Sequence, residues 1–260
     1  MDALRWRHDH PAEFVPEWEL WHASRQKRVA ATHGPLTLTG THWLLYGDTV
    51  IDGVPGTWRA EDGQVRLTGG EGLSVTEGLL PVDRWLHYGE VDLLTIQRGE
   101  DLAVRVYDPR AEAVARFTRI DAFAPDPAWR IEAEFVPAAD ADSVHIAHSN
   151  TAREEDYPVF GTFVFEVDGV RAELVALHSG EENGAHLTFR DGTSGHESYG
   201  AARFLFVTAP PAGGPVTLDF NRSQLPPCAF SDAFVCPLPP PGNIVPFRIE
   251  AGEQRVVSEG

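Results

Sequence analysis

The sequence predicts a mainly β protein: an antiparallel domain, barrel-like or sandwich-like, with an N-terminal α-helix packed on it. Short segments in which apolar and polar residues alternate recur along most of the chain, and turn residues separate them. Apolar residues at helical spacing form one good helix, near the N-terminus. Many short strands with little helix are typical of antiparallel barrels and sandwiches.

The predicted helix covers residues 11–31. Phe14, Trp18 and Trp21 recur at helical spacing, which makes one face of the helix apolar. A Gly-Pro pair at 34–35 marks the end of the helical segment. We therefore expect this helix to pack across a sheet through its apolar face.

Twelve strands are predicted after the helix. They cover residues 36–40, 42–46, 64–68, 91–97, 102–107, 129–136, 143–148, 160–167, 170–178, 203–208, 216–220 and 247–251. Ile131, Ala133 and Phe135 show the alternation, since every second residue of a strand lies on the same face. The Asp168-Gly169 pair between two of these segments predicts a type I′ hairpin turn.

We expect two parts in the chain: a helical segment, 1–33, and a single antiparallel β domain, 34–260. The β domain includes a proline-rich loop at 222–246. Proline fixes φ and removes a backbone donor, so this loop is expected to be rigid and to close one end of the barrel. The Pro-Asp-Pro break at 125–127 is read either as a loop or as a boundary between two β subdomains.

The charge of the chain excludes several classes of partner. Its 260 residues carry 21 basic and 39 acidic side chains, a net charge of −18. Such a protein repels phosphate backbones and anionic lipids, so we expect neither nucleic acid nor a membrane as partner. The sequence has no apolar run of about 18 residues and no apolar N-terminal stretch of a signal peptide, which predicts a cytoplasmic protein.

The last third of the chain concentrates small, polar and rigid residues, and any binding site is expected there. The eight candidate ligand-binding residues are Asp191, Ser194, Tyr199, Arg203, Asp219, Asn221, Asn243 and Glu253.

Five motifs of this region together resemble the C-terminal signature of a bacterial and archaeal family, the domain-of-unknown-function family number sixteen eighty-four. They are Asp191-Gly192-Thr193-Ser194-Gly195, Leu218-Asp219-Phe220-Asn221, Pro226-Pro227-Cys228-Ala229, Cys236-Pro237-Leu238-Pro239-Pro240 and Ala251-Gly252-Glu253. Segments 36–47, 104–108 and 123–131 are similar to upstream parts of the same family. The activity of the family is not established, so the resemblance implies no particular reaction.

Arg203 is the candidate with the most specific expected partner. Pairing of segments 203–208 and 216–220 in a hairpin places Arg203 opposite Asp219 or Asn221, on a face that is otherwise apolar. A buried arginine needs a partner, so we predict an Arg203–Asp219 ion pair. These residues either tie the hairpin to the proline-rich loop or, with Tyr199, form a clamp for a carboxylate or phosphate.

The preferred function is binding of a small anionic molecule in a pocket lined by the C-terminal segment. The alternatives are a hydrolase that uses Asp191, Glu197 or Glu253 with Tyr199 and Arg203, and a purely structural or oligomerising module. The sequence leaves open whether the chain is an enzyme and whether it forms a homo-oligomer.

No cofactor and no metal ion are expected. The chain lacks a glycine-rich dinucleotide fingerprint. His145 and His148 are three residues apart on a predicted strand and face opposite sides of it. Ser194 is not in a Gly-x-Ser-x-Gly motif, and His196 lies too close along the chain to serve easily as its base.

Cys228 and Cys236 are the two cysteines of the chain. Buried reduced thiols, a loop-closing disulfide and metal ligation all remain open for this pair. A reducing cytosol disfavours the disulfide, and the spacing matches no zinc pattern.

Overall fold

Antiparallel strands make up most of the protein, and the predicted fold class is confirmed: antiparallel sheets with a half-barrel and an N-terminal helix. The computed structural model describes residues 11–139, 142–149 and 154–259. Contacts divide the chain into two compact units, residues 1–26 with 118–258 and residues 27–117 with 259–260. This division does not test where parts of the chain fold independently, so the expected domains 1–33 and 34–260 stay a prediction.

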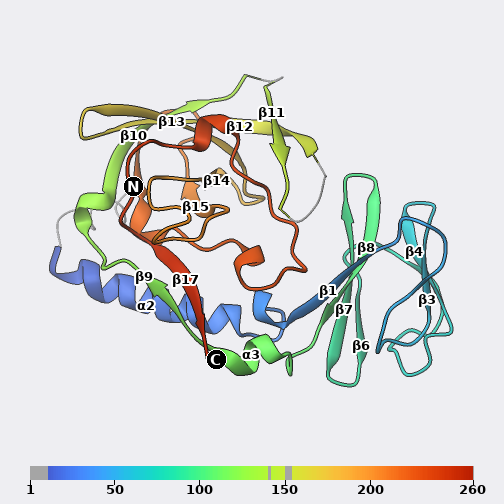
Figure 1. The fold of residues 1–260 in the computed structure, drawn as a ribbon. Coiled ribbons are helices and arrows are strands. Elements are labelled where there is room, and N and C mark those ends of the chain that lie inside the picture. Colours follow the sequence, from blue (N-terminus) through green and yellow to red (C-terminus); the bar gives the residue numbers. More distant parts are fainter. Residues whose placement is uncertain (1–10, 140–141, 150–153, 260) are drawn as a thin grey trace. The chain divides into compact units, whose positions relative to one another are not determined.

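The first unit (residues 1–26 and 118–258) is built on a seven-stranded sheet with the order β15-β14-β13-β12-β10-β16, in which β11 also pairs with β12 (Figure 1). The strands are β10 (Arg130–Pro137), β11 (Ser143–Ala147), β12 (Glu154–Val167), β13 (Val170–His178), β14 (Gly184–Phe189), β15 (Arg203–Thr208) and β16 (Gly214–Asp219). All the strand pairs are antiparallel.

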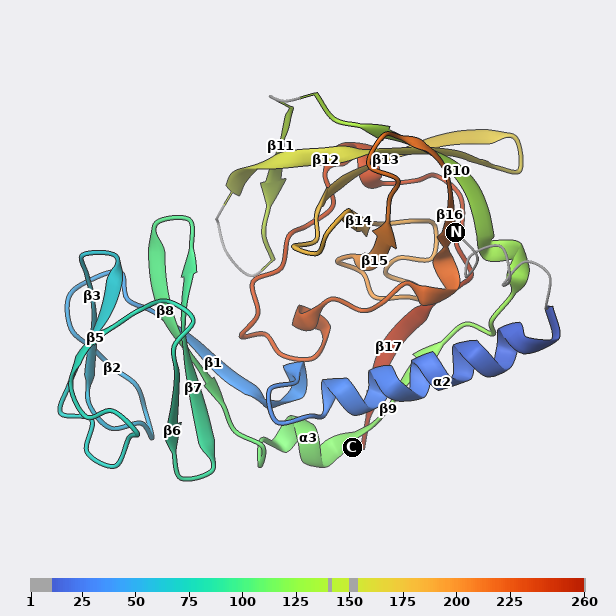
Figure 2. The same cartoon turned by 180° about the vertical axis from the view of Figure 1, so that it is seen from behind.

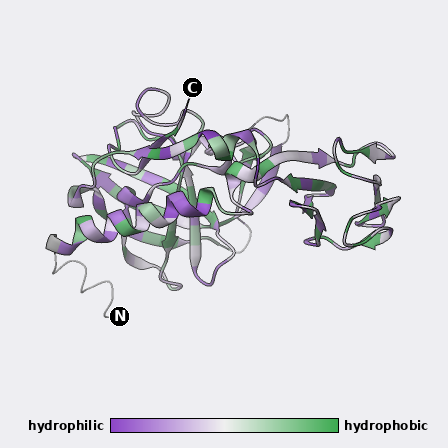
Figure 3. Ribbon diagram, turned by 90° about the horizontal axis from the view of Figure 1, so that it is seen from below, coloured by the Kyte–Doolittle hydropathy of each residue, from purple (hydrophilic) through white to green (hydrophobic). Residues whose placement is uncertain are grey.

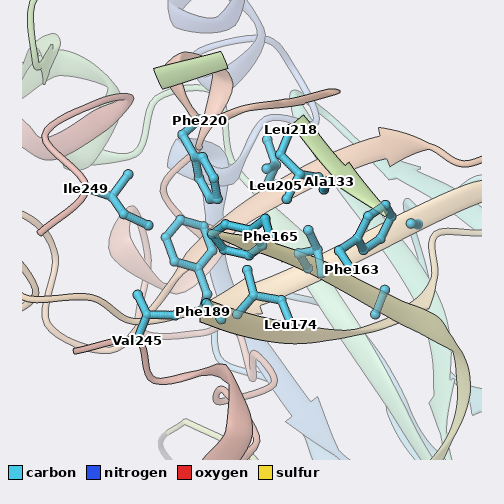
Figure 4. Close-up of a cluster of buried hydrophobic side chains, with 14 of the residues drawn as sticks. Ala133, Phe163, Phe165, Leu174, Phe189, Leu205, Leu218, Phe220, Val245 and Ile249 are labelled. Atoms are coloured by element: carbon cyan, nitrogen blue, oxygen red, sulfur yellow. The ribbon is translucent and has the colours of Figure 1, made fainter. Parts of the chain in front are cut away.

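The core of this unit lies on one face of the sheet. Period-two alternation sends Ala185, Leu187 and Phe189 of β14 to that face, where all three are buried. Three phenylalanine rings meet there (Figure 4): Phe220 lies 5.6 Å from Phe189 and 5.7 Å from Phe165 between ring centroids. The irregular C-terminal chain completes the core with Val245 and Ile249 (Figure 4).

The predicted Asp168-Gly169 turn is confirmed. It joins β12 to β13, with Val167 opposite Val170. Asp168 has φ of 51° and Gly169 has φ of 80°, the positive values that a type I′ turn requires.

Helix α2 (Pro11–Val29) runs beside a two-stranded sheet of β9 (Phe117–Ala122) and β17 (Glu253–Ser258), seen from both sides in Figures 1 and 2. The side chain of Gln26 accepts a hydrogen bond from Ile120 N at 3.1 Å, which joins the helix to β9. Figure 3 shows hydrophilic and hydrophobic residues mixed along the helix; Phe14 and Val29 are buried, whereas Leu20 is exposed.

The chain from 220 to 252 carries no strand and follows the edges of the first unit, orange to red in Figure 1. Short 3-10 helices interrupt it: η3 (Phe220–Arg222), η4 (Pro227–Ala229) and η5 (Pro241–Asn243). Single β-bridges attach it to the rest of the unit at Gln224, Pro237 and Ile244. A further 3-10 turn, η2 (Pro127–Trp129), precedes β10.

The second unit (residues 27–117 and 259–260) consists of two four-stranded antiparallel sheets, with the orders β1-β8-β7-β6 and β2-β3-β4-β5. Its elements are η1 (Pro35–Thr37), β1 (Leu38–Trp43), β2 (Thr49–Val50), β3 (Thr57–Glu61), β4 (Gln64–Thr68), β5 (Gly78–Leu80), β6 (Trp85–Tyr88), β7 (Val91–Arg98), β8 (Asp101–Tyr107) and α3 (Glu112–Arg116). The sheets share one core, in which Trp58 of β3 and Leu93 of β7 are fully buried.

Three of the predicted strands differ in the structure. Segments 36–40 and 42–46 contribute to a single strand, β1. Segment 247–251 is irregular, because the carbonyl oxygens of Ile249 and Ala251 accept hydrogen bonds from an arginine side chain. Among the residues that the structure describes, no helix has both the length and the apolar composition that crossing a membrane demands.

Candidate functional site

Arg203, at the start of β15, is the centre of a buried polar cluster. Its guanidinium lies 3.2 Å from the Asp191 carboxylate, and both side chains are fully buried. The same group donates to the carbonyl oxygens of Ile249, at 2.9 Å, and Ala251. Burial lowers the pKa of Arg203, and the neighbouring Asp191 opposes that change. The cation is therefore held by partners within the protein.

Asp191 is fixed by the tight turn that follows β14. Thr193 Oγ1 donates to its carboxylate at 2.9 Å, and Ser194 Oγ donates at 3.1 Å. Asp191 N in turn donates to Ser194 Oγ at 3.1 Å, and Ile249 N donates to the carboxylate. Ser194 thus closes a turn around Asp191, a common role of short hydroxylated side chains.

The predicted Arg203–Asp219 ion pair is wrong, as is the hairpin on which it rests. β15 pairs with β14, whereas β16 pairs with β10 and places Asp219 opposite Arg130. β15 and β16 stand at opposite ends of the strand order. The turn-rich loop between them therefore links two edges of a half-barrel and is not a hairpin turn.

Asn221 and Asp219 are brought together by η3. Asn221 is fully buried; its side-chain amide accepts from Asp126 N and donates to Asp126 O, both at 2.9 Å. Asp219 accepts from the Asn221 side chain at 3.0 Å, and Trp18 of α2 donates to Asn221 O at 2.8 Å. Asn221 thus joins the C-terminal segment to the loop before β10 and to the helix.

The side-chain amide of Asn243, at the end of η5, bonds to the backbone of β13 and β14 as a neighbouring strand would. Its amide accepts from Val175 N at 2.8 Å and donates to Val175 O at 2.8 Å and Thr188 O at 2.9 Å. These bonds satisfy backbone groups of β13 and β14 on the core side. Asn243 is fully buried and its amide hydrogens are used within the fold.

Glu253 pairs with Arg25 of α2, a residue that the sequence analysis missed. The carboxylate lies 3.2 Å from Arg25 and accepts from Leu225 N at 2.7 Å. Arg25 also donates to Leu225 O at 3.0 Å. Arg25 lies one helical turn beyond Trp21 and two turns beyond Trp18, so a cation on the apolar face of the helix was the signal that could have revealed it.

The three carboxylates considered for hydrolysis each have an arginine of their own. Asp191 pairs with Arg203 and Glu253 with Arg25. Glu197 is half-exposed and lies 2.8 Å from Arg248, whose hydrogen bond lowers the pKa of Glu197. An arginine partner favours the ionised form of a carboxylate, which suits an ion pair better than proton transfer at neutral pH.

Tyr199 lies apart from the Arg203 cluster, at the two cysteines. Its hydroxyl donates to Cys228 O at 3.3 Å, and its ring packs with Phe234 against the cluster of Ala202, Phe204, Cys228 and Cys236. Both cysteines are buried and free, which agrees with the first of the three states considered for them.

A depression lies where the β13–β14 turn meets β15. Its volume is about 240 Å³, and its lining residues are Ser179, Glu181, Gly184, Ala185, Phe206, Val207 and Thr208. None of the eight predicted residues lines it. The Phe206 side chain is 49% exposed, which is unusual for a phenylalanine on a strand.

His186 holds the Phe206 ring in place. Strand register sets the two opposite each other, and their rings stack at 4.8 Å with an interplanar angle of 8°. Phe204 also meets the imidazole edge-on, at 4.5 Å. Burial lowers the pKa of His186 to about 4, so the imidazole is neutral at pH 7. An apolar aromatic platform therefore faces the depression.

Among the described residues, no group of three or more histidine, cysteine, aspartate or glutamate side chains is placed to hold a metal ion. His145 instead lies between two carboxylates, at 3.0 Å from Glu154 and 2.9 Å from Asp156, on an exposed surface.

The fold and the buried polar network define an antiparallel β protein. In it, polar side chains hydrogen-bond the irregular C-terminal segment to the half-barrel. Residues 115–254 match the model of the family "Protein of unknown function (DUF1684)". This match spans more than half of the chain, and the protein belongs to that family; the resemblance drawn from the C-terminal motifs is confirmed. The similarity of segments 36–47 and 104–108 lies outside the matched residues and stays a prediction.

One similar solved structure is the solution NMR structure of the uncharacterized protein from gene locus rrnAC0354 of Haloarcula marismortui. It is 34% identical to this chain, with a TM-score of 0.45, and the match covers 53% of this chain and 77% of that one. None of the curated proteins matches the chain.

Proposed function

We propose that the first unit binds a small organic molecule in the depression beside β15, and that this molecule is neutral or cationic. The observation that carries the proposal is the exposed Phe206 ring, stacked on the neutral His186 imidazole and facing a hollow of about 240 Å³. Pockets for drug-sized ligands measure roughly 300–1,000 Å³, so the occupant is smaller than such a ligand.

The lining favours a flat ligand with a hydrogen-bonding group. Phe206 offers a ring for stacking, and Ser179 and Thr208 are the two hydroxylated residues of the lining. Glu181 is the one charged residue of the lining. A carboxylate attracts a cation and repels an anion, so this depression does not suit the anionic ligand expected from the sequence.

Three matched probes test the proposal: tyramine, which is cationic, tyrosol, which is neutral, and 4-hydroxyphenylacetate, which is anionic. Backbone amide NMR shifts of the full chain are followed during titration with each probe. Tyramine and tyrosol are expected to shift amides of residues 179–185 and 206–208 in the millimolar range, and the anion is not. No shift in these segments from any probe would overturn the proposal.

Two variants and a control sharpen the test. Phe206→Ser is expected to abolish the shifts from both binding probes, because it removes the stacking surface. Glu181→Gln is expected to weaken the binding of tyramine and to leave the binding of tyrosol unchanged. Val170→Ser is the control, since Val170 is also an exposed apolar residue, 40% exposed, but lies at the β12–β13 turn.

The anion clamp at Arg203 is the second candidate and is tested by inorganic phosphate in the same titration. It requires phosphate to displace Asp191 or the two carbonyl groups from the guanidinium. Phosphate shifts around residues 191–203, without shifts at the depression, would support it. The hydrolase alternative gains no support from the three separate arginine–carboxylate pairs.

A further inference from the structure

The two cysteines of the chain meet in the C-terminal segment. Cys228 lies in η4, and its backbone N–H donates to Cys236 Sγ at 3.3 Å. The chain between them folds back through a loop stiffened by hydrogen bonds such as Phe234 N to Ser231 O at 3.1 Å. Both side chains belong to one buried cluster, so the two thiols are close neighbours.

Polar groups lie close to Cys228 Sγ. The Tyr199 hydroxyl lies 3.9 Å from this sulfur. The Ser149 hydroxyl lies beside the pair, where it accepts from Cys236 N at 3.0 Å. Donors aimed at a sulfur stabilise its negative charge, whereas the buried cysteines of a purely apolar core have no such neighbours.

The charge state of Cys228 agrees with this geometry. The hydrogen bond from Cys236, followed by those from Ser149 and Tyr199, lowers the pKa of Cys228 to about 7, against the opposing effect of burial. Burial and the neighbouring Cys228 raise the pKa of Tyr199, so its hydroxyl keeps its proton and remains a donor. A sizeable fraction of Cys228 is then thiolate at neutral pH.

We propose that Cys228 and Cys236 form a redox-active dithiol that a small hydroperoxide oxidises to an intramolecular disulfide. The Cys228 thiolate attacks one peroxide oxygen and the O–O bond breaks; the departing alkoxide or hydroxide takes a proton, and Cys228 becomes a sulfenic acid. The Cys236 thiol then attacks Cys228 Sγ, the S–S bond forms, and the S–O bond breaks with release of water. The peroxide gains two electrons and the two thiols lose them; an external thiol restores the pair.

The surroundings select the oxidant. Cys228 is 5% exposed and Cys236 is 4% exposed, so the surface of another protein does not reach them in the folded chain, and the reagents that act on them are small molecules. Hydrogen peroxide is small enough to reach the two sulfur atoms. A thiolate next to a resolving cysteine is the arrangement that favours disulfide formation over further oxidation.

The test treats the full, reduced chain with hydrogen peroxide and follows intact mass and peptide maps. We expect loss of two hydrogen atoms per chain, a cross-link between the peptides of Cys228 and Cys236, and full reversal by dithiothreitol. Because the chain has two cysteines, any intramolecular disulfide is this pair. An absence of reaction in the folded chain, or disulfides only between chains on a non-reducing gel, would overturn the proposal.

Variants assign the two roles. In Cys236→Ser, dimedone is expected to trap a sulfenic acid at Cys228; in Cys228→Ser, Cys236 is expected to stay unlabelled. Tyr199→Phe is expected to slow the oxidation several-fold and to move its pH profile to higher pH. Each variant is first checked for a thermal unfolding transition like that of the parent. Labelling of Cys236 in preference to Cys228, or a pH profile unchanged in Tyr199→Phe, would contradict the roles assigned here.

Discussion

Replacing Arg203 with methionine is expected to lower the free energy of unfolding by about 3–5 kcal/mol, because it leaves a buried charge without its counter-ion. The change removes the 3.2 Å ion pair with Asp191 and the hydrogen bonds to the carbonyls of Ile249 and Ala251. Each hydrogen bond to a charged group contributes about 1.5–3 kcal/mol, but such values do not add within one network. Asp191 keeps its three other donors, which limits the loss to the range of one broken buried pair.

Urea unfolding of the parent and the variant measures this loss as a lower midpoint at an unchanged slope. Arg248→Met is the matched control, because Arg248 also pairs with carboxylates, Glu197 and Glu250, but at the surface. It is expected to change the midpoint little, since exposed ion pairs contribute weakly. If Arg203→Met were as stable as the parent or more stable, the structural role of Arg203 would be refuted, and an anionic ligand would be the better explanation of the cation.

Four further outcomes follow from the contacts. Arg25→Met is expected to cost about 3 kcal/mol in urea unfolding, because it leaves the fully buried Glu253 without its cation. Asn243→Asp is expected to cost about 2–4 kcal/mol, since a carboxylate lacks the two amide hydrogens used there; an unchanged midpoint would contradict this. The pKa of His186 is about 4 in the folded chain against an ordinary 6.5, so the unfolded chain binds the proton first as pH falls. The free energy of unfolding is therefore expected to be unaffected by His186 above pH 6.5 and to fall by up to about 3 kcal/mol as pH falls toward 4. His186→Phe should make the free energy of unfolding less dependent on pH in this range. Gly169→Ala is expected to lower stability by about 1 kcal/mol in thermal unfolding through its φ of 80° alone, because no atom lies within 4 Å of the added Cβ.

Local patterns predicted most of the strands and the clearest turn. Segments 64–68, 170–178 and 203–208 have the predicted bounds, because alternation along one strand is a property of that strand's own residues. Which strands pair with each other is not a property of one strand's own residues. The partnership of β16 with β10 joins segments that are far apart in the chain, and it depends on which edges remain free once the half-barrel has curved.

The buried polar residues of the candidate site were recognisable from sequence, but their partners were not. Arg203 was expected to need a counter-ion, and it has one, yet the ion comes from the turn at Asp191 and not from Asp219. Segment 247–251 alternates like a strand, but its carbonyls bond to a side chain instead of a neighbouring strand. The depression beside β15 was missed because it arises from the register of β14 and β15, which sets Phe206 opposite His186.

The hydrogen bonds between α2 and the C-terminal segment have a consequence for folding during synthesis on the ribosome. Arg25 bonds to Leu225 O, 200 positions later, and Trp18 bonds to Asn221 O, 203 positions later. The helix therefore waits for about 200 further residues to be synthesised before its buried cation and indole find their acceptors. Contacts so distant in sequence slow folding, and they leave the apolar face of the helix exposed during synthesis. A nascent chain arrested before residue 220 would present that face to chaperones, whereas one extended beyond Glu253 would not.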